Sequence, residues 1–201
     1  MRFKSIISIL LVLLISISLI TAAFADGEEP EEYFVTLPYT QYASGGTENQ
    51  LRAVILFENS NSTFTRYQIA FHSCTCRDAS INYMSVMYVE LLNTKDTADE
   101  AKIRSISFRE NKDSNVGLWG DSDPVYGHPE YTEEYMNENY VQKLVGATKA
   151  EIDAWGGYGT QLECIDADTV SGATVSTSNI VSVLQALFAY HADHYYADKQ
   201  T

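Results

Sequence analysis

The sequence predicts an α+β domain in which a small mixed or antiparallel sheet packs against a C-terminal amphipathic helix. Runs with strand character fill the first half of the chain, and helical patterns fill the second half. These segments do not alternate in a regular βαβ order, which disfavours a doubly wound sheet. With 201 residues and 45% hydrophobic content, the chain has enough apolar material for a core, so wholesale disorder is excluded.

Four segments predict strands. Residues 52–57 (RAVILF) and 67–71 (YQIAF) are β-rich and flank the turn-forming cluster 58–62 (ENSNS). Residues 85–92 (SVMYVELL) predict a buried strand. Residues 102–108 (KIRSISF) alternate in the manner of a half-buried strand, although neither face is fully apolar.

Three segments predict helices. The first covers residues 132–144, and the second begins at Thr148, where Thr148-Lys-Ala-Glu151 matches a capping box. The last runs from about residue 176 to residue 195. Its apolar positions recur at steps of three and four residues and predict one buried face, made of Ile180, Val183, Leu184, Leu187 and Phe188.

The N-terminus indicates export. Arg2 and Lys4 precede an uncharged stretch at residues 6–24, and Ala23-Phe24-Ala25 matches the small-residue site of a signal peptidase. Residues 1–25 are therefore expected to be a signal peptide. The alternative is an uncleaved membrane anchor, because nineteen uncharged residues nearly reach the ~20 that span a bilayer. Either reading places the rest of the chain outside the cytoplasm, secreted or membrane-associated.

The charge balance limits the partners. The chain has 13 Lys and Arg against 27 Asp and Glu, for a net charge of −14. An acidic surface argues against nucleic acid, whose binding requires cations that displace counterions. It argues equally against electrostatic attachment to anionic lipid. Residues 26–32 (DGEEPEE) are expected to be an acidic tether.

One motif carries chemistry. Residues 168–177 (DTVSGATVST) form a small-residue turn that leads into the last helix. Gly172 and Ala173 allow close approach of a ligand, Thr174 presents a hydroxyl, and the free N–H groups of a helix start favour a phosphate. The alternative is that Ser171, Thr174 and Ser176 are competing N-caps of an ordinary helix.

This motif resembles the flavinylation sequence of the FMN-binding domain family. The family includes the C subunit of the sodium-pumping NADH:quinone oxidoreductase and the G subunit of the Rnf complex. In that family a flavin transferase takes FMN from FAD, releases AMP, and joins FMN to the threonine through a phosphoester. The resemblance implies that Thr174 is the acceptor, that Ser171, Gly172 and Ala173 form the turn, and that Asp168 and Ser176 complete the motif.

The resemblance also suggests an organisation of the chain. The order of predicted elements from about residue 82 to residue 195 resembles that domain, so residues 82–201 are expected to be the FMN-binding domain. Residues 33–81 have no clear counterpart and are treated as an N-terminal β-rich extension. The isoalloxazine ring requires an apolar resting place, for which Trp119, Tyr126, Trp155 and Tyr158 are candidates, with ordinary packing as the alternative for each.

A second Gly-Ala-Thr provides an internal control. Residues 146–148 repeat the tripeptide, but Val145 stands in place of the serine and no aspartate lies three residues before it. The capping box at Thr148 explains this copy, so Thr148 is expected to be unmodified.

The three cysteines leave several possibilities open. Cys74 or Cys76 could form a disulfide with Cys164 in an exported protein, or the thiols could be unpaired. His72, Cys74 and Cys76 form H-x-C-x-C, which matches none of the usual zinc spacings. Metal or redox roles for these residues are the least favoured interpretation.

The function indicated by these features is extracytoplasmic electron transfer by a bacterial flavoprotein with FMN covalently bound to Thr174. The expected partners are an FAD-dependent flavin transferase and a membrane electron donor, either a quinol or a membrane flavoprotein. We expect an electron carrier rather than a stand-alone oxidoreductase, because no nicotinamide-binding motif is present. Two alternatives stand: a binding or adhesion module whose S-G-A-T only caps a helix, and a flavin-dependent extracellular reductase.

Overall fold

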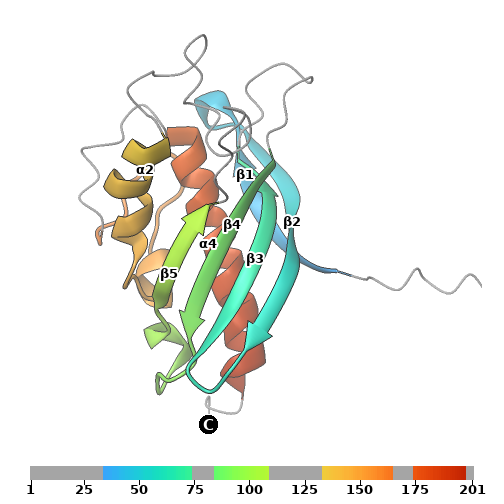
Figure 1. Ribbon diagram of the computed structural model, residues 1–201. Coiled ribbons are helices and arrows are strands. Elements are labelled where there is room, and N and C mark those ends of the chain that lie inside the picture. The colour runs from blue at the N-terminus through green and yellow to red at the C-terminus, as the bar shows by residue number, and fades with distance from the viewer. Residues whose placement is uncertain (1–33, 74–83, 109–132, 165–173, 198–201) are drawn as a thin grey trace, which may run out of the picture. The chain divides into compact units, whose positions relative to one another are not determined.

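The computed structural model describes residues 34–73, 84–108, 133–164 and 174–197, and structural statements here refer to these residues (Figure 1). Residues from Phe34 onward form one compact unit. The predicted signal peptide (1–25) and acidic tether (26–32) lie outside the described residues.

Five strands form one antiparallel sheet in the order β1-β2-β3-β4-β5. Because each strand pairs with the next one in sequence, the sheet is a simple meander. The α+β prediction is confirmed, and the sheet is antiparallel throughout its described strands. The strands are β1 (Val35–Tyr42), β2 (Glu48–Ser60), β3 (Phe64–His72), β4 (Met84–Leu92) and β5 (Ile103–Phe108).

The helices lie on one face of this sheet. Figure 1 shows α4 running along the sheet with α2 beside it. Two short 3₁₀ turns, η1 and η2, lie in the connections between strands. The helical elements are η1 (Ser44–Gly46), η2 (Ala98–Glu100), α2 (Glu133–Asn139), η3 (Val141–Leu144), α3 (Lys149–Asp153) and α4 (Thr174–Tyr195).

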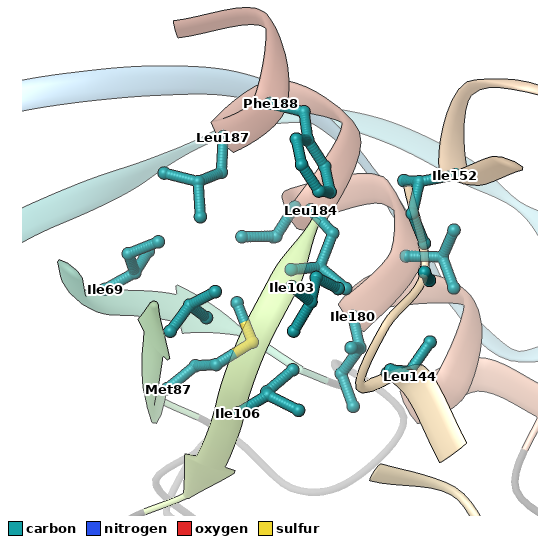
Figure 2. Close-up of a cluster of buried hydrophobic side chains, with 14 of the residues drawn as sticks. Ile69, Met87, Ile103, Ile106, Leu144, Ile152, Ile180, Leu184, Leu187 and Phe188 are labelled. Carbon is teal, nitrogen blue, oxygen red and sulfur yellow. The ribbon is translucent and has the colours of Figure 1, made fainter. Parts of the chain in front are cut away.

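The core lies between the sheet and α4. Figure 2 shows side chains from the strands, including Ile69, Met87 and Ile103, directed toward residues of α4. The predicted buried face of the last helix is confirmed, because all five of its residues are fully buried: Ile180, Val183, Leu184, Leu187 and Phe188. Burying each such side chain contributes about 1.5–3 kcal/mol, so this interface supplies much of the stability of the fold.

Burial of α4 extends beyond one face. Twelve of its 22 residues are buried, and residues 178–184 are buried without interruption. Several of them are small polar residues, namely Ser176, Ser178, Asn179 and Ser182. The first half of α4 is therefore an interior helix, which a periodicity of apolar residues alone does not reveal.

Two predicted elements differ from the structure. Residues 58–60, expected in a turn, extend β2, because Ser60 pairs with Thr65 across the β2–β3 hairpin. The single helix expected at residues 132–144 is divided into α2 and η3 by Tyr140, whose backbone (φ −128°, ψ −61°) leaves the helical region.

The expected boundary between residues 33–81 and 82–201 falls inside the sheet. Strands β1 to β3 pair in order with β4 and β5, so residues on both sides share one sheet and one core. Within the described residues, no helix combines the length and apolar content required to cross a bilayer.

Candidate functional site

Thr174 is the first residue of α4, and its side chain is half-buried. The predicted acceptor threonine therefore lies where the chain enters the longest helix of the described structure. Ser176, in the same turn, is fully buried. Five of the other predicted site residues, Asp168, Ser171, Gly172, Ala173 and Trp119, lie outside the described residues, as does Tyr126.

A buried amide fixes the next turn of α4. The Oδ1 atom of Asn179 accepts a hydrogen bond of 2.6 Å from the backbone N–H of Tyr42. Its Nδ2 atom donates to the backbone oxygens of Tyr42 (2.9 Å) and Ser73 (2.7 Å). These bonds join α4 to the ends of β1 and β3. Sequence reasoning missed Asn179, because its partners are more than 100 residues away along the chain.

Tyr140 also binds the first part of α4, through the backbone of Thr177. Its hydroxyl donates to the backbone oxygen of Thr177 over 3.2 Å, and the Thr177 hydroxyl donates to the backbone oxygen of Thr174. Burial raises the pKa of Tyr140 well above its usual range, and the nearby Cys164 adds to this effect. Tyr140 therefore remains a hydrogen-bond donor at all physiological pH values and fixes the path of the helix start.

Three aromatic residues gather beside this region. The ring of Tyr42 lies 5.8 Å from that of Trp155, edge to face, and 5.6 Å from that of Tyr158. Trp155 is buried and donates its Nε1–H to the backbone oxygen of Thr160. Gly46 allows the close approach of Tyr158, since a Cβ atom there would lie 2.9 Å from the Tyr158 ring.

Two of these aromatics were candidates from the sequence. The structure brings Trp155 and Tyr158 together through Tyr42, which sequence reasoning missed. The same Tyr42 provides the backbone groups that bind Asn179, so the aromatic cluster is connected directly to the first turns of α4.

A pocket of about 540 Å³ lies beside the aromatic cluster. Its volume is within the range of small-molecule and cofactor sites. One wall is the side of α3 and the two residues that follow it, and the other is the segment 161–164. The lining residues are Ala150, Glu151, Ala154, Trp155, Gln161, Leu162, Glu163 and Cys164.

The charges around this pocket are negative. Hydrogen bonds from the backbone and hydroxyl of Thr148 lower the pKa of Glu151, so its carboxylate is ionised at neutral pH. Burial and the charge of Glu151 raise the pKa of the Cys164 thiol, which is therefore protonated. The pocket can accept an uncharged aromatic group against Trp155 and Leu162, whereas it repels a phosphate.

The second Gly-Ala-Thr has the predicted structure. Thr148 is the N-cap of α3; its hydroxyl accepts from the backbone N–H of Glu151, and the Glu151 carboxylate accepts from the backbone N–H of Thr148. The Thr148 hydroxyl also donates to that carboxylate over 2.9 Å. The capping box is confirmed.

The structure bears on only some of the possibilities for the three cysteines, which were a disulfide, unpaired thiols or a metal site. Cys164 is exposed and forms no disulfide with any described residue, while Cys74 and Cys76 lie outside the described residues. Across the described ranges, no group of three His, Cys, Asp or Glu side chains is arranged to hold a metal ion.

Comparisons of the chain with protein-family models, with curated proteins and with solved structures found no match. The resemblance of residues 168–177 to a flavinylation sequence therefore stays a prediction. It rests on the sequence of the motif, whose last four residues belong to α4.

Proposed function

We propose that this protein is an extracytoplasmic electron-transfer flavoprotein that carries FMN covalently bound to Thr174. The observation that carries the proposal is the place of Thr174. The residue that the motif designates as acceptor is the first described residue of a 22-residue helix and is half-buried rather than enclosed. The residues after it are held by hydrogen bonds of Tyr140 and Asn179.

The start of α4 suits the phosphate. The dipole of a helix favours negative charge near its N-terminal end by about 0.3–1 kcal/mol at an exposed site. The chain has a net charge of −14, so an anion requires a local site of this kind. Ser176, which the resemblance includes in the site, is fully buried, so its side chain is not accessible to a phosphate at the surface.

The pocket of Trp155 and Cys164 suits the ring. Its lining is mixed, with Trp155 and Leu162 beside Glu151 and Glu163; the aromatic side chain suits an isoalloxazine and the carboxylates disfavour the phosphate, so we assign the two halves of FMN to separate places. The pocket lies beside the residues that fix α4: Trp155 contacts Tyr42, and Cys164 is close enough to Tyr140 to affect its pKa. Cys164 also stands only ten residues before Thr174.

These positions suggest what the cofactor and the protein each contribute to electron transfer. FMN, when bound, supplies one- and two-electron redox chemistry. The chain tethers the cofactor through Thr174, shields one face of the ring with Trp155, and lowers the affinity for electrons through Glu151 and Glu163. A flavin transferase would attach FMN from FAD to the Thr174 hydroxyl with release of AMP. A quinol or a membrane flavoprotein would supply the electrons.

The helix boundary also bears on the binding-module alternative. An N-cap residue precedes the first helical residue. Thr174 and Ser176 both lie within α4, so neither of them occupies its capping position. A purely capping role is therefore less suited to these two residues than to Thr148.

The test is a pair of matched threonine variants. The full chain is co-expressed with a flavin transferase, denatured, and examined for yellow fluorescence and for the added mass of one FMN. We expect the wild-type chain and Thr148→Ala to carry covalent flavin and Thr174→Ala to carry none. Flavin retained in Thr174→Ala, or a colourless wild-type chain, would reject the proposal.

A further inference from the structure

The three arginines of the described residues all lie on the face of the sheet that points away from α4. They are Arg52 in β2, Arg66 in β3 and Arg104 in β5, and all three are exposed. Each is next in sequence to a buried residue of the core. These core neighbours are Ala53, Tyr67 and Ile103. Because side chains alternate between the two faces of a strand, the arginines point to the other face, on which no described helix lies (Figure 1).

A buried carboxylate joins two of these arginines. Glu90 of β4 is only 8% exposed. Its Oε1 atom accepts hydrogen bonds from Nε (2.8 Å) and Nη2 (2.6 Å) of Arg66, and its Oε2 atom accepts one from Nη1 of Arg104. Burial opposes its ionisation, but the hydrogen bonds from Arg66, Ser105 and Arg104 lower its pKa, so the carboxylate is charged at neutral pH. Two guanidinium groups around one carboxylate leave one positive charge in excess.

An aromatic ring also holds both guanidinium groups. The Cζ atom of Arg104 lies 4.3 Å from the centre of the Phe64 ring, and that of Arg66 lies 5.7 Å from it. A cation over such a ring is attracted by it. Both arginine side chains are still about half-exposed. Within the described residues, Nη1 of Arg66 and both Nε and Nη2 of Arg104 have no hydrogen-bond partner. We call Phe64, Arg66 and Arg104 the arginine cluster.

An aromatic surface lies next to the arginine cluster on the same face. Gln68, two positions after Arg66 on β3, pairs with Phe57 of β2 and with Tyr88 of β4. Phe57 is 49% exposed, and the Gln68 amide donates a hydrogen bond of 3.3 Å to the Tyr88 hydroxyl. Residues two positions apart on a strand are separated by about 7 Å. The face therefore presents cations and aromatic rings about 7 Å apart.

The charge of the arginine cluster is opposite to that of the chain. With a net charge of −14, the chain as a whole repels an acidic partner, so the excess positive charge of this cluster is a local exception. Arginine side chains form paired hydrogen bonds with carboxylates. Because Glu90 and Phe64 already hold these two arginines in place, they lose little conformational freedom on binding, which favours affinity.

We propose that this face binds an extended acidic segment of a partner protein, in which an Asp or Glu and an aromatic residue stand two positions apart. The carboxylate binds Arg66 and Arg104, and the aromatic side chain contacts Phe57 and Tyr88. An extended segment separates such side chains by about 7 Å, which matches the spacing on the sheet. Arginine and aromatic side chains are also enriched at the energetic centres of protein interfaces. The proposal is independent of the flavin at Thr174.

The experiment measures the binding of two short peptides to the full chain. One has the sequence Ser-Thr-Phe-Thr-Glu-Thr-Ser, the other has Gln in place of Glu, and both carry an uncharged dye for fluorescence anisotropy in a zwitterionic detergent. We expect the Glu peptide to bind about fivefold more tightly than the Gln peptide, as for an exposed ion pair. This preference should decrease as salt is raised, because salt screens exposed charges.

Two arginine variants provide a matched comparison. Arg104→Gln and Arg52→Gln each remove one positive charge from the same face, but Arg52 bonds to Thr36 and lies outside the arginine cluster. We expect Arg104→Gln to abolish the preference for the Glu peptide and Arg52→Gln to preserve it within about twofold. In Arg104→Gln the carboxylate of Glu90 keeps its bonds to Arg66, so this variant is expected to fold.

A third variant tests the aromatic part of the surface. Phe57→Ser changes an exposed side chain and should weaken binding of both peptides while the preference for Glu persists. Equal affinity of the wild-type chain for the two peptides, or equal losses in Arg104→Gln and Arg52→Gln, would overturn the proposal. Self-association of the wild-type chain that Arg104→Gln removes would assign the face to a second copy and overturn it as well. Flavin content plays no part in this readout.

Discussion

The tripeptide Gly-Ala-Thr occurs twice, at residues 146–148 and 172–174, and in each case its threonine stands at the start of a helix. At α3, Thr148 is the N-cap and its hydroxyl is held by Glu151. At α4, Thr174 is already within the helix, and the turns after it are held by Asn179 and Tyr140. The same three residues therefore have different local structures, which depend on the residues that follow them.

The largest loss of stability is expected from substitution of Asn179, whose side chain holds the first turns of α4. Asn179→Ala removes three buried hydrogen bonds and leaves the N–H of Tyr42 without its partner. We expect the free energy of unfolding in urea to fall by about 3 kcal/mol, because each unsatisfied buried group costs about 1–3 kcal/mol. Gln50→Ala, which loses one exposed contact, is the control and should change it by less than about 0.5 kcal/mol. A loss below about 1 kcal/mol in Asn179→Ala would show that α4 is held by other contacts.

A smaller effect is expected at the other helix start. Thr148→Ala removes the N-cap of α3 and should lower the free energy of unfolding by about 1 kcal/mol. Urea unfolding at neutral pH measures this loss.

The loss in Thr148→Ala should depend on pH. The pKa of Glu151 is lowered in the folded chain, so its contribution is present above the ordinary value of 4.5 and disappears as the pH falls through the folded value. The difference in the free energy of unfolding between wild type and Thr148→Ala should therefore be constant above pH 4.5 and should decrease below it. A difference that stayed constant under acid would mean that the Thr148 cap acts without the Glu151 carboxylate.

The smallest effect on stability is expected from a variant that makes residues 145–148 identical to residues 171–174. Val145→Ser converts residues 145–148 into a second Ser-Gly-Ala-Thr. Val145 is exposed, so stability should change by less than about 0.5 kcal/mol. On the proposed function, Thr148 should remain unmodified, because its hydroxyl is engaged by Glu151. Peptide mapping after co-expression with the transferase checks this, and FMN on Thr148 would show that four residues suffice without the structural setting.

The parts of the fold predicted from the sequence are those set by neighbouring residues. The strand runs, the capping box of Thr148 and the buried stripe from Ile180 to Phe188 depend on local pattern and are confirmed. The break at Tyr140 was missed, because its hydroxyl bonds to Thr177 on a helix 37 residues away. Local periodicity contains no information about such a partner.

The candidate site shows the same limit. Thr174 was predicted from its motif and Tyr158 from its glycine-rich loop, so both predictions used residues that are close in sequence. Tyr42 and Asn179 were missed, although they connect these two regions, since they meet only when β1 and α4 pack together. The pocket likewise depends on how segment 161–164 lies against α3, which no short motif encodes.

The bond between the first strand and the last helix also sets an order of events during biosynthesis. Asn179 satisfies both backbone groups of Tyr42 across 137 residues of chain. A polypeptide that emerges N-terminus first cannot complete the end of β1 until residues 174–195 have followed it. On the proposed function, cofactor attachment therefore cannot precede the synthesis of α4, which contains the acceptor Thr174. A chain terminated before α4 would lose both its acceptor and the element that closes its core.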